Sequence, residues 1–472
     1  MIVGRKDELL LLRQLMVSER SEFVAIYGRR RIGKTFLVRE AFANKFVFHH
    51  TGILDASLKE QLKEFRESLY SAGMSRTAMP KTWGEAFHLL EHHIETLQAK
   101  KKVLFIDELP WMDTPKSNFI RALDHFWNSW ASARKDIILI VCGSATSWII
   151  SNIIMNYGGL HNRLTRQIHL KPFCLRECEE YCQKANLGFT RKQVMEAYMA
   201  FGGIPFYWSY LIKGQSLAQN FDRMFFSSKG ELTMEYDALY NSLFRRPQTH
   251  VKLIEALATK RIGLTREELL QATHLEDNET FSKALGELEQ CDFIRKYQCF
   301  GKKTKSATYQ LIDNFTLFYF KFMKNNVHSD TAFWTSSYQT PLHSTWAGLA
   351  FEQVCLQHVN QIKKALGISA VVTTAYSWIH RTQNSNDKGV QIDLVIDRND
   401  DVITICEMKY SGSKYLITSD EDAKLRNRRE VLIRETKTNK SVMIAMVTVF
   451  GLEKGGYAND IQAEITMDDL FE

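Results

Sequence analysis

Proline and long apolar runs are scarce in this sequence. Proline contributes 7 of 472 residues, about 1.5% against an average near 5%. Because proline interrupts helices, its scarcity favours a helix-rich chain. The best apolar stretch, residues 137–150, is broken by Gly143, Ser144 and Thr146. Since a membrane span needs ~18 consecutive apolar residues, we expect no contact with a membrane.

Paired cysteines are also missing. None of the eight cysteines has the CxxC spacing. Cys174, Cys178 and Cys182 recur every four residues, a spacing that favours packing on one helix face over a metal or cluster site. Charged residues from Arg5 to Glu8 precede any apolar run, unlike a signal peptide. Free thiols without a leader favour a reducing compartment, so we expect a cytoplasmic protein.

Charge of one sign is not in large excess. The chain has 61 Lys and Arg against 54 Asp and Glu, a net charge of +7. This excess is compatible with a nucleic-acid partner without requiring one. A hydrophobic share of 45% and a charged share of 24% exclude disorder and fibrous repeats as the main character of the chain. The length predicts roughly two to four domains.

A glycine-rich loop follows the first predicted strand, residues 22–28. The loop reads Gly28, Arg29, Arg30, Arg31, Ile32, Gly33, Lys34 and Thr35. This is GxxxxGK[ST] between a strand and a helix, the context that the motif requires. Glycines let the backbone approach phosphate, and amides at the helix start point at the anion. We predict that Lys34 contacts the β- and γ-phosphates and that Thr35 binds Mg²⁺; the alternative is a glycine turn in a basic loop.

Two carboxylates follow a second apolar strand. Residues 103–106 are apolar and lead into Asp107 and Glu108, which would lie at the edge of a buried sheet. Asp107 would hold Mg²⁺ through water, and Glu108 would polarise the attacking water. A third predicted strand ends at Ser144, which places a polar group at the same edge, and residues 166–170 are a fourth candidate strand.

These motifs resemble the archaeal-type ATPases of the AAA+/STAND group. The opening Val3-Gly4-Arg5 with Glu8 resembles a box that lies beside the adenine in that family. Residues 28–35 match its Walker A motif, Asp107–Glu108 its Walker B motif and Ser144 its sensor-1 position. The resemblance implies a parallel sheet in the AAA+ strand order, ATP and Mg²⁺ as cofactors, and a homo-oligomer that forms on ATP binding.

Two later segments carry the same resemblance. Arg163, which follows Gly158-Gly159-Leu160, resembles the family's arginine finger. Arg166 is a rival for that role, and either arginine could be a solvated surface charge. The sequence from Phe201 to Tyr207, with Pro205, resembles the GxP element of a helical lid.

Residues 249–312 combine three short predicted helices with a basic hairpin. The helices are expected over His250–Thr259, from Thr265, and over Glu279–Gln290. Thr265 and Glu268 form a capping-box signature. The hairpin carries Lys302, Lys303 and Lys305.

This combination is typical of a winged helix. In that fold the third helix can enter the major groove of DNA, and lysines of the wing can meet phosphate. We therefore predict DNA as a partner. The alternative is a winged helix used for intramolecular docking or protein contact.

The last third of the chain contains a possible metal site. Asp393 lies in the predicted strand 389–397, and the next strand ends in Glu407-Met-Lys409. Strand alternation puts Glu407 and Lys409 on one face. Asp393 and Glu407 could hold Mg²⁺, and Lys409 could position or deprotonate the attacking water.

This pattern resembles the PD-(D/E)xK nucleases. Asp393 matches the motif aspartate, Glu407 and Lys409 match ExK, and Glu352 lies where an accessory helix glutamate often occurs. The chain departs from the family pattern in having no proline before Asp393. A basic helix over residues 420–440 would suit a phosphate backbone. The alternatives are an inactive nuclease fold, ordinary strand charges and a solvated helix face.

The fold class we predict is α/β and multidomain. The expected parts are an ATPase core over residues 1–171, a helical lid over 172–248, a winged helix over 249–330 and a restriction-endonuclease-like domain over 331–472. The first functional hypothesis is an ATP-hydrolysing, DNA-associated protein with a metal-dependent nuclease domain. The second is a nucleotide-dependent regulatory switch or scaffold with an inactive nuclease fold.

Overall fold

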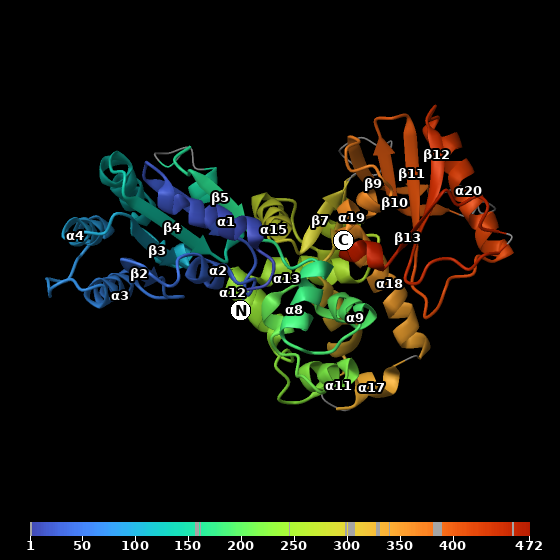
Figure 1. The fold of residues 1–472 in the computed structure, drawn as a ribbon, viewed down its shortest axis with the longest axis horizontal. Helices are drawn as coiled ribbons and strands as arrows, with labels where there is room; N and C mark the ends of the chain where they lie inside the picture. Colours follow the sequence, from blue (N-terminus) through green and yellow to red (C-terminus); the bar gives the residue numbers. More distant parts are fainter. Residues whose placement is uncertain are drawn as a thin grey trace. The chain divides into compact units, whose positions relative to one another are not determined.

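Two compact units divide the chain in the computed structural model (Figure 1). The first comprises Met1–Pro172 with Ser242–Arg245, and the second comprises Phe173–Asn241 with Arg246–Glu472. The structure describes residues 2–155, 160, 162–244, 246–297, 300, 307–326, 331–338, 340–380, 389–455 and 457–472. The second unit contains the segments that we assigned to the winged helix and the C-terminal domain. It also contains the predicted lid, except for Pro172 and Ser242–Arg245.

A five-stranded parallel sheet is the centre of the first unit. Its strands are β1 (Glu22–Tyr27), β2 (Phe48–Thr51), β3 (Lys102–Asp107), β4 (Ile137–Gly143) and β5 (Arg166–His169). They lie in the order β2-β3-β4-β1-β5, and every neighbouring pair is parallel. Strands β3 and β4 are buried throughout and β1 nearly so, which explains their continuous apolar runs. The predicted α/β fold with a parallel sheet is confirmed.

Strand β2 is the one strand of this sheet that the sequence did not predict. Two of its four residues are histidines, so it has no apolar run. His50 is nevertheless buried, and its Nδ1 lies 2.9 Å from the hydroxyl of Ser68. Burial lowers the pKa of His50 to about 3, so the ring is neutral and packs as an uncharged core residue.

In the described part of the first unit, seven α-helices accompany the parallel sheet. They are α1 (Lys6–Gln14), α2 (Lys34–Ala41), α3 (Leu58–Ser71), α4 (Trp83–Glu95), α5 (Leu109–Met112), α6 (Phe119–His125) and α7 (Thr146–Ile149). Helix α3 begins with a capping box between Ser57 and Glu60. Fully buried aromatic rings join α3, α4 and α6, with Trp83 4.9 Å from Phe119 and 5.5 Å from Phe65 between centroids.

The second unit begins with the helices of the predicted lid. They are α8 (Leu175–Lys184), α9 (Arg191–Phe201), α10 (Pro205–Trp208), α11 (Leu217–Phe221) and α12 (Glu235–Leu243). The rings of Phe201, Tyr207 and Trp208 are buried in the core of these helices, whereas Phe206 is exposed. Cys178 and Cys182 are also buried on α8, in agreement with helix packing.

Two glycines make the sharp connection between α9 and α10. Gly202 ends α9 with φ 65°, a left-handed value that favours glycine. The carbonyl of Gly203 accepts from the amide of Phe173 at 2.7 Å, and a Cβ at Gly203 would lie 1.9 Å from the Phe173 oxygen. Pro205 then opens α10 at its first turn, where proline costs no hydrogen bond.

A helix–hairpin module covers residues 248–311. Its elements are α13 (Gln248–Ala258), β6 (Leu264–Thr265), α14 (Arg266–Thr273), α15 (Glu279–Gln290), β7 (Ile294–Tyr297) and β8 (Thr308–Leu311). The strands form an antiparallel sheet in the order β6-β8-β7. The capping box at Thr265 and the helix Glu279–Gln290 are confirmed. Lys302, Lys303 and Lys305 lie outside the described residues.

A second five-stranded sheet forms the C-terminal part, after α16 (Asn314–Phe318), α17 (Phe333–Ser337), α18 (Pro341–Gln357) and α19 (Val359–Ala365). Its elements are β9 (Thr373–His380), β10 (Val390–Arg398), β11 (Val402–Lys409), α20 (Ser419–Thr436), β12 (Ser441–Thr448) and β13 (Ala463–Thr466). The order is β13-β12-β11-β10-β9. Helix α20 packs on β10 and β12, and α18 packs on β11. Among the described residues, no helix combines the length and apolar character that crossing a membrane requires.

Gly203→Ala should destabilise the protein because the new Cβ overlaps a backbone oxygen. Overpacking of this kind costs about 1–3 kcal/mol, seen as a lower midpoint of thermal or urea unfolding of the second unit. Gly348→Ala in α18 is the control, since a Cβ there meets nothing within 4 Å and alanine favours a helix by about 0.5–1 kcal/mol. Equal midpoints for the two variants would contradict the packing described here.

Candidate active site

The carboxyl ends of β1, β3 and β4 meet at one edge of the parallel sheet. Strand β4 lies between β1 and β3, and all three run in the same direction. The glycine-rich loop follows β1, Asp107 ends β3 with Glu108 after it, and Ser144 follows β4. This edge is where parallel α/β sheets bind their ligands. The three predicted motifs therefore lie together.

The backbone of the glycine-rich loop needs its glycines at two positions. Gly28 has φ 141°, and a Cβ there would lie 2.3 Å from the oxygen of Leu170. Gly33 has φ 87° and is the N-cap residue of α2, where no side chain caps the helix. The first amides of α2 are consequently not occupied by a capping side chain, as an anion site requires.

The side chains of the loop divide between anchoring and binding roles. Ile32 is buried, and so is Arg29. Lys34 is 6% exposed, and its Nζ donates to the carbonyl oxygens of Gly28 and Arg29, each at 2.9 Å. The ammonium is therefore held across the loop, inside the turn where the motif places phosphates.

A hydrogen-bond network joins the ends of β1, β3 and β4. The hydroxyl of Thr35 donates to Asp107 Oδ2 at 2.5 Å, and Asp107 Oδ1 accepts from the amide of Glu108 at 2.9 Å. Glu108 Oε2 accepts from both the amide and the hydroxyl of Ser144, at 3.1 and 2.9 Å. Glu108 itself has φ 45°, a left-handed value that is uncommon outside glycine and marks functional sites.

The pKa of Glu108 is raised above its ordinary value. Burial is the main cause, and the negative charge of Asp107 acts in the same sense. The ammonium of Lys34 and the hydrogen bonds from Ser144 act in the opposite sense, because they favour the ionised carboxylate. A carboxylate with a raised pKa is a better proton acceptor near neutral pH.

The N-terminal segment is fixed against the end of the first unit. Gly4 and Arg5 both have φ 57°. The guanidinium of the buried Arg5 donates to the carbonyl of Lys171 at 2.6 Å and pairs with Glu8 at 3.8 Å. Arg5 is thus a tether between the two ends of this unit. Its predicted place beside the adenine stays a prediction, and Pro205 belongs to the other unit.

Sequence reasoning missed the contribution of β2 to the site. Gly52, which follows β2, donates its amide to the carbonyl of Asp107 at 3.0 Å, and a Cβ at Gly52 would lie 2.7 Å from the oxygen of Glu108. Because β2 has no apolar run, the glycine after it gave no recognisable signal.

The two candidate finger arginines differ little in their surroundings. Arg163 and Arg166 are both exposed, and Arg166 donates to the carbonyl of Thr165 at 2.7 Å. Gly158 and Gly159 of the predicted finger segment lie outside the described residues. The choice between the two arginines stays open.

A family model now identifies the region that holds these motifs. Residues 2–211 match the model of an ATPase domain predominantly from Archaea. This part of the chain is similar to the archaeal-type ATPase domain. It includes the parallel sheet, the glycine-rich loop, Asp107–Glu108 and the segment up to α10.

Relatives and solved structures are similar to this chain over different lengths. An uncharacterized protein of Methanocaldococcus jannaschii is 25% identical over 88% of this chain and 88% of its own. An uncharacterized ATP-binding protein of the same organism is 40% identical over 10% of this chain and 76% of its own. A Walker-type ATPase of Pyrococcus abyssi shares 17% identity with a TM-score of 0.49, covering 67% of this chain and 95% of its own. The ORC2 protein of Aeropyrum pernix shares 14% identity with a TM-score of 0.31, covering 66% and 90%.

Outside the ATPase domain, Glu407 and Lys409 lie at the end of β11 and form an ion pair of 2.8 Å. The other oxygen of Glu407 accepts from Arg428 of α20 at 2.5 Å. Glu407 shares a cavity with Met446, which belongs to the core between the sheet and α20. The ExK pair therefore lies on the α20 face of the sheet.

Asp393 is turned to the opposite face by a β-bulge. The register of β10 on β9 shifts between Ile392 and Val395, and both of these side chains belong to the core beneath α20. Two residues thus lie between them where regular alternation has one. Asp393 follows the orientation of Gln391, whose Nε2 donates to Asp393 Oδ1 at 2.6 Å.

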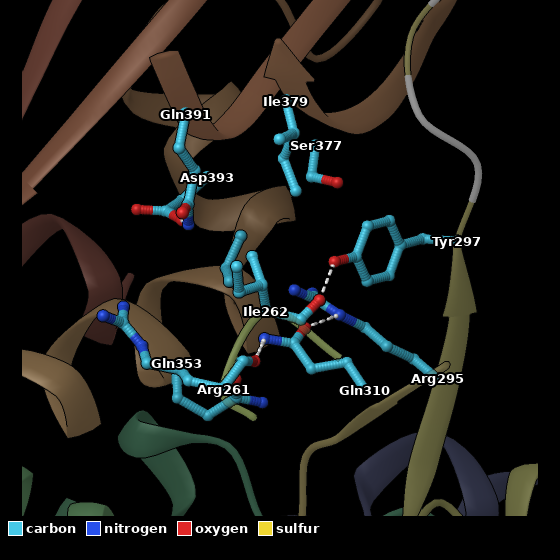
Figure 2. A pocket seen from close by; sticks show the side chains of 11 residues that line it. Arg261, Ile262, Arg295, Tyr297, Gln310, Gln353, Ser377, Ile379, Gln391 and Asp393 are labelled. Carbon is cyan, nitrogen blue, oxygen red and sulfur yellow. Dashed lines mark hydrogen bonds between the residues drawn. The ribbon is translucent and has the colours of Figure 1, made fainter. Parts of the chain in front are cut away.

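On that face Asp393 meets arginines of the helix–hairpin module. Figure 2 shows Gln391 and Asp393 beside a pocket of about 20 Å³ that Arg261 and Arg295 also line. Asp393 interacts electrostatically with both guanidinium groups, and burial lowers the pKa of both. Glu352 is likewise occupied, by an ion pair with Arg261.

The carboxylates of the predicted metal set, Glu352, Asp393 and Glu407, do not lie together in this structure, and a metal site there stays a prediction. Within the described part of the chain, no three His, Cys, Asp or Glu side chains group so that they could hold a metal ion. The physical reason is the bulge, which sequence alternation does not reveal, together with the pairing of each carboxylate with a basic group.

Ser144→Ala should shift the acid limb of the pH–rate profile of ATP hydrolysis to higher pH. The change removes the hydroxyl that favours the ionised form of Glu108, so the already raised pKa rises further and less carboxylate is available as pH falls. Initial rates of phosphate release across the pH range measure the shift. Ser147→Ala on α7 is the control; an unmoved acid limb in Ser144→Ala would show that the bond does not tune Glu108.

Proposed function

We propose that this chain binds ATP with Mg²⁺ and hydrolyses it. The observation that carries the proposal is the network at the sheet edge, where Thr35 contacts Asp107 and Ser144 contacts Glu108. In this network the hydroxyl of Thr35 and the carboxylate of Asp107 lie side by side, as a metal ion requires. The carboxylate of Glu108 is a second acid, which can act on water. The match of residues 2–211 to an ATPase family supports the same function.

The residues present fit a triphosphate. The uncapped start of α2 offers backbone amides to an anion. The Nζ of Lys34 already bridges two carbonyl oxygens of the loop, and phosphate oxygens would be stronger acceptors for its charge. Mg²⁺ would be held by Thr35 and, through water, by Asp107, and it would neutralise charge on the β- and γ-phosphates.

Glu108 is the residue that would act on water. Its carboxylate accepts the hydrogen bond of a water molecule, which then attacks the γ-phosphorus while the bond to the β-γ bridging oxygen breaks. The proton of that water passes toward Glu108, and ADP leaves with the electron pair. The amide and the hydroxyl of Ser144 both donate to Oε2 of Glu108. The other oxygen, Oε1, would then accept the hydrogen bond of the water.

A neighbouring chain would complete the site. Arg163 and Arg166 are exposed, as a residue that reaches into another copy must be. Positive charge supplied in this way stabilises the transition state of phosphoryl transfer. We therefore propose a homo-oligomer that forms on ATP binding, with Arg163 as the finger.

DNA association would involve the helix–hairpin module, whose elements agree with a winged helix. The polar face of α15 is partly occupied within the module, because Ser282 accepts from Arg266 and Glu287 pairs with His250 at 2.8 Å. This favours contacts with the phosphate backbone over base reading by α15.

For the C-terminal domain, the second functional hypothesis has the better support. The element order from α18 to β13 agrees with a nuclease-like fold. The separation of Asp393 from Glu407 and Lys409 favours a domain that does not cut by a metal mechanism. We propose that ATP turnover drives a regulatory switch that presents this domain to DNA.

Glu108→Gln should lower the rate of ATP hydrolysis by about 10²–10⁴-fold, the usual contribution of a general base, without loss of ATP binding. Lys34→Ala should lose binding itself, because the ammonium that meets the phosphates is gone. Phosphate release and ATP titration separate the two effects. Glu40→Gln, an exposed carboxylate on α2, is the control, and full hydrolysis by Glu108→Gln would overturn its assignment.

Arg163→Ala should lower hydrolysis by about 10³-fold or more, the value of an arginine finger, and Arg166→Ala should lower it far less. Mixing Arg163→Ala with Glu108→Gln chains should restore part of the activity, since some interfaces then combine an intact Arg163 with an intact Glu108. If mixing restores nothing while the chains still associate, the arginine does not act between copies.

A further inference from the structure

A cavity of about 170 Å³ lies between the end of β11 and α20. Its charged lining residues are Glu407, Lys409, Glu421, Lys424 and Arg428. A water molecule occupies roughly 30 Å³ of liquid, so the cavity has room for a tetrahedral oxyanion together with water. Three cations and two carboxylates line it.

Both carboxylates of the cavity are already occupied. Glu407 pairs through one oxygen with Lys409 at 2.8 Å and through the other with Arg428 at 2.5 Å. Glu421 accepts from the hydroxyl of Tyr415 and from the backbone and side chain of Thr418. Neither carboxylate is left facing the cavity as a bare anion.

The cations retain unused donors. A guanidinium has five N–H groups and an ammonium has three. Arg428 and Lys409 each make one contact to Glu407, so most of their donors remain available. Lys424 is exposed at the cavity. Within the described ranges, the hydrogen bonds and ion pairs of these three side chains go to Glu407, and Lys409 also interacts electrostatically with Glu421. Their surplus of donors and positive charge suits an anion.

A divalent metal does not fit this arrangement. Such an ion needs several oxygen ligands with open lone pairs, whereas both oxygens of Glu407 face cations. The aspartate that would join Glu407 lies on the opposite face of the sheet, beside Arg261 and Arg295. Fixed ammonium and guanidinium groups thus stand where the nuclease resemblance implies Mg²⁺.

We propose that this cavity binds a phosphate group through Lys409, Lys424 and Arg428, without a divalent metal. An arginine fork and converging lysines are the usual partners of phosphate oxygens. The ligand is a phosphate dianion: the terminal 5′-phosphate of a nucleic-acid strand, a mononucleotide or free inorganic phosphate. This site is separate from the ATP site of the other unit and does not depend on hydrolysis.

The test uses the full chain with Lys34→Ala, so that the ATP site does not contribute, in buffer containing EDTA. Fluorescence anisotropy compares one oligonucleotide bearing a 5′-phosphate with the same oligonucleotide bearing a 5′-hydroxyl. We expect the 5′-phosphate to bind roughly tenfold more tightly, the value of charge-assisted hydrogen bonds. Lys424→Ala and Arg428→Ala should each remove most of that preference.

Arg429→Ala on the same helix is the matched control, because Arg429 does not line the cavity, and it should keep the preference. Competition by inorganic phosphate distinguishes the sources. Suppose that both oligonucleotides bind equally, that inorganic phosphate displaces a bound mononucleotide, and that Lys424→Ala abolishes mononucleotide binding. This combination assigns the site to free phosphate. A preference that needs added Mg²⁺ or Mn²⁺, cleavage of the oligonucleotide, or binding unchanged in Lys424→Ala and Arg428→Ala would overturn the proposal.

Discussion

The structure depends on the parallel pairing of β1, β4 and β3. The carboxyl ends of parallel strands lie at the same edge of a sheet, so strand direction alone brings residues that are far apart in the sequence together there. Asp107 ends β3, Glu108 and Ser144 follow the ends of β3 and β4, and Thr35 lies in the first turn of α2 after the loop that follows β1; hydrogen bonds join them at that edge. The buried apolar runs behind them fix the register, and the glycines allow the backbone to turn close to the ligand.

The sequence predicted that these residues share one sheet edge because the signals for the strands and the loop are local. A glycine-rich loop between an apolar strand and a helix determines backbone shape over eight residues, and strand ends that carry acids need no long-range information. Strand β2 was missed for the opposite reason. His50 is neutral because its burial in the surrounding core lowers its pKa, and that burial is a property of the whole fold that the sequence of the segment does not reveal.

The C-terminal domain shows where such reasoning fails. Alternation correctly put Glu407 and Lys409 on one face of β11, but a single extra residue in β10 turns Asp393 away. Bulges leave no reliable mark in one sequence, and the arginines that meet Asp393 lie about a hundred residues earlier. In this structure the oxygens of Glu407 face Lys409 and Arg428. The sequence thus keeps the D…ExK pattern, although Asp393 does not lie on the same face of the sheet as Glu407 and Lys409.

The most direct test of the central claim is calorimetric titration of ATP into the full chain, with and without Mg²⁺. Mg²⁺ should tighten ATP binding in the wild-type protein, and Thr35→Ala, which removes the hydroxyl beside Asp107, should lose this dependence while still binding ATP. The same dependence on Mg²⁺ in Thr35→Ala as in the wild-type protein would contradict the site described at the sheet edge.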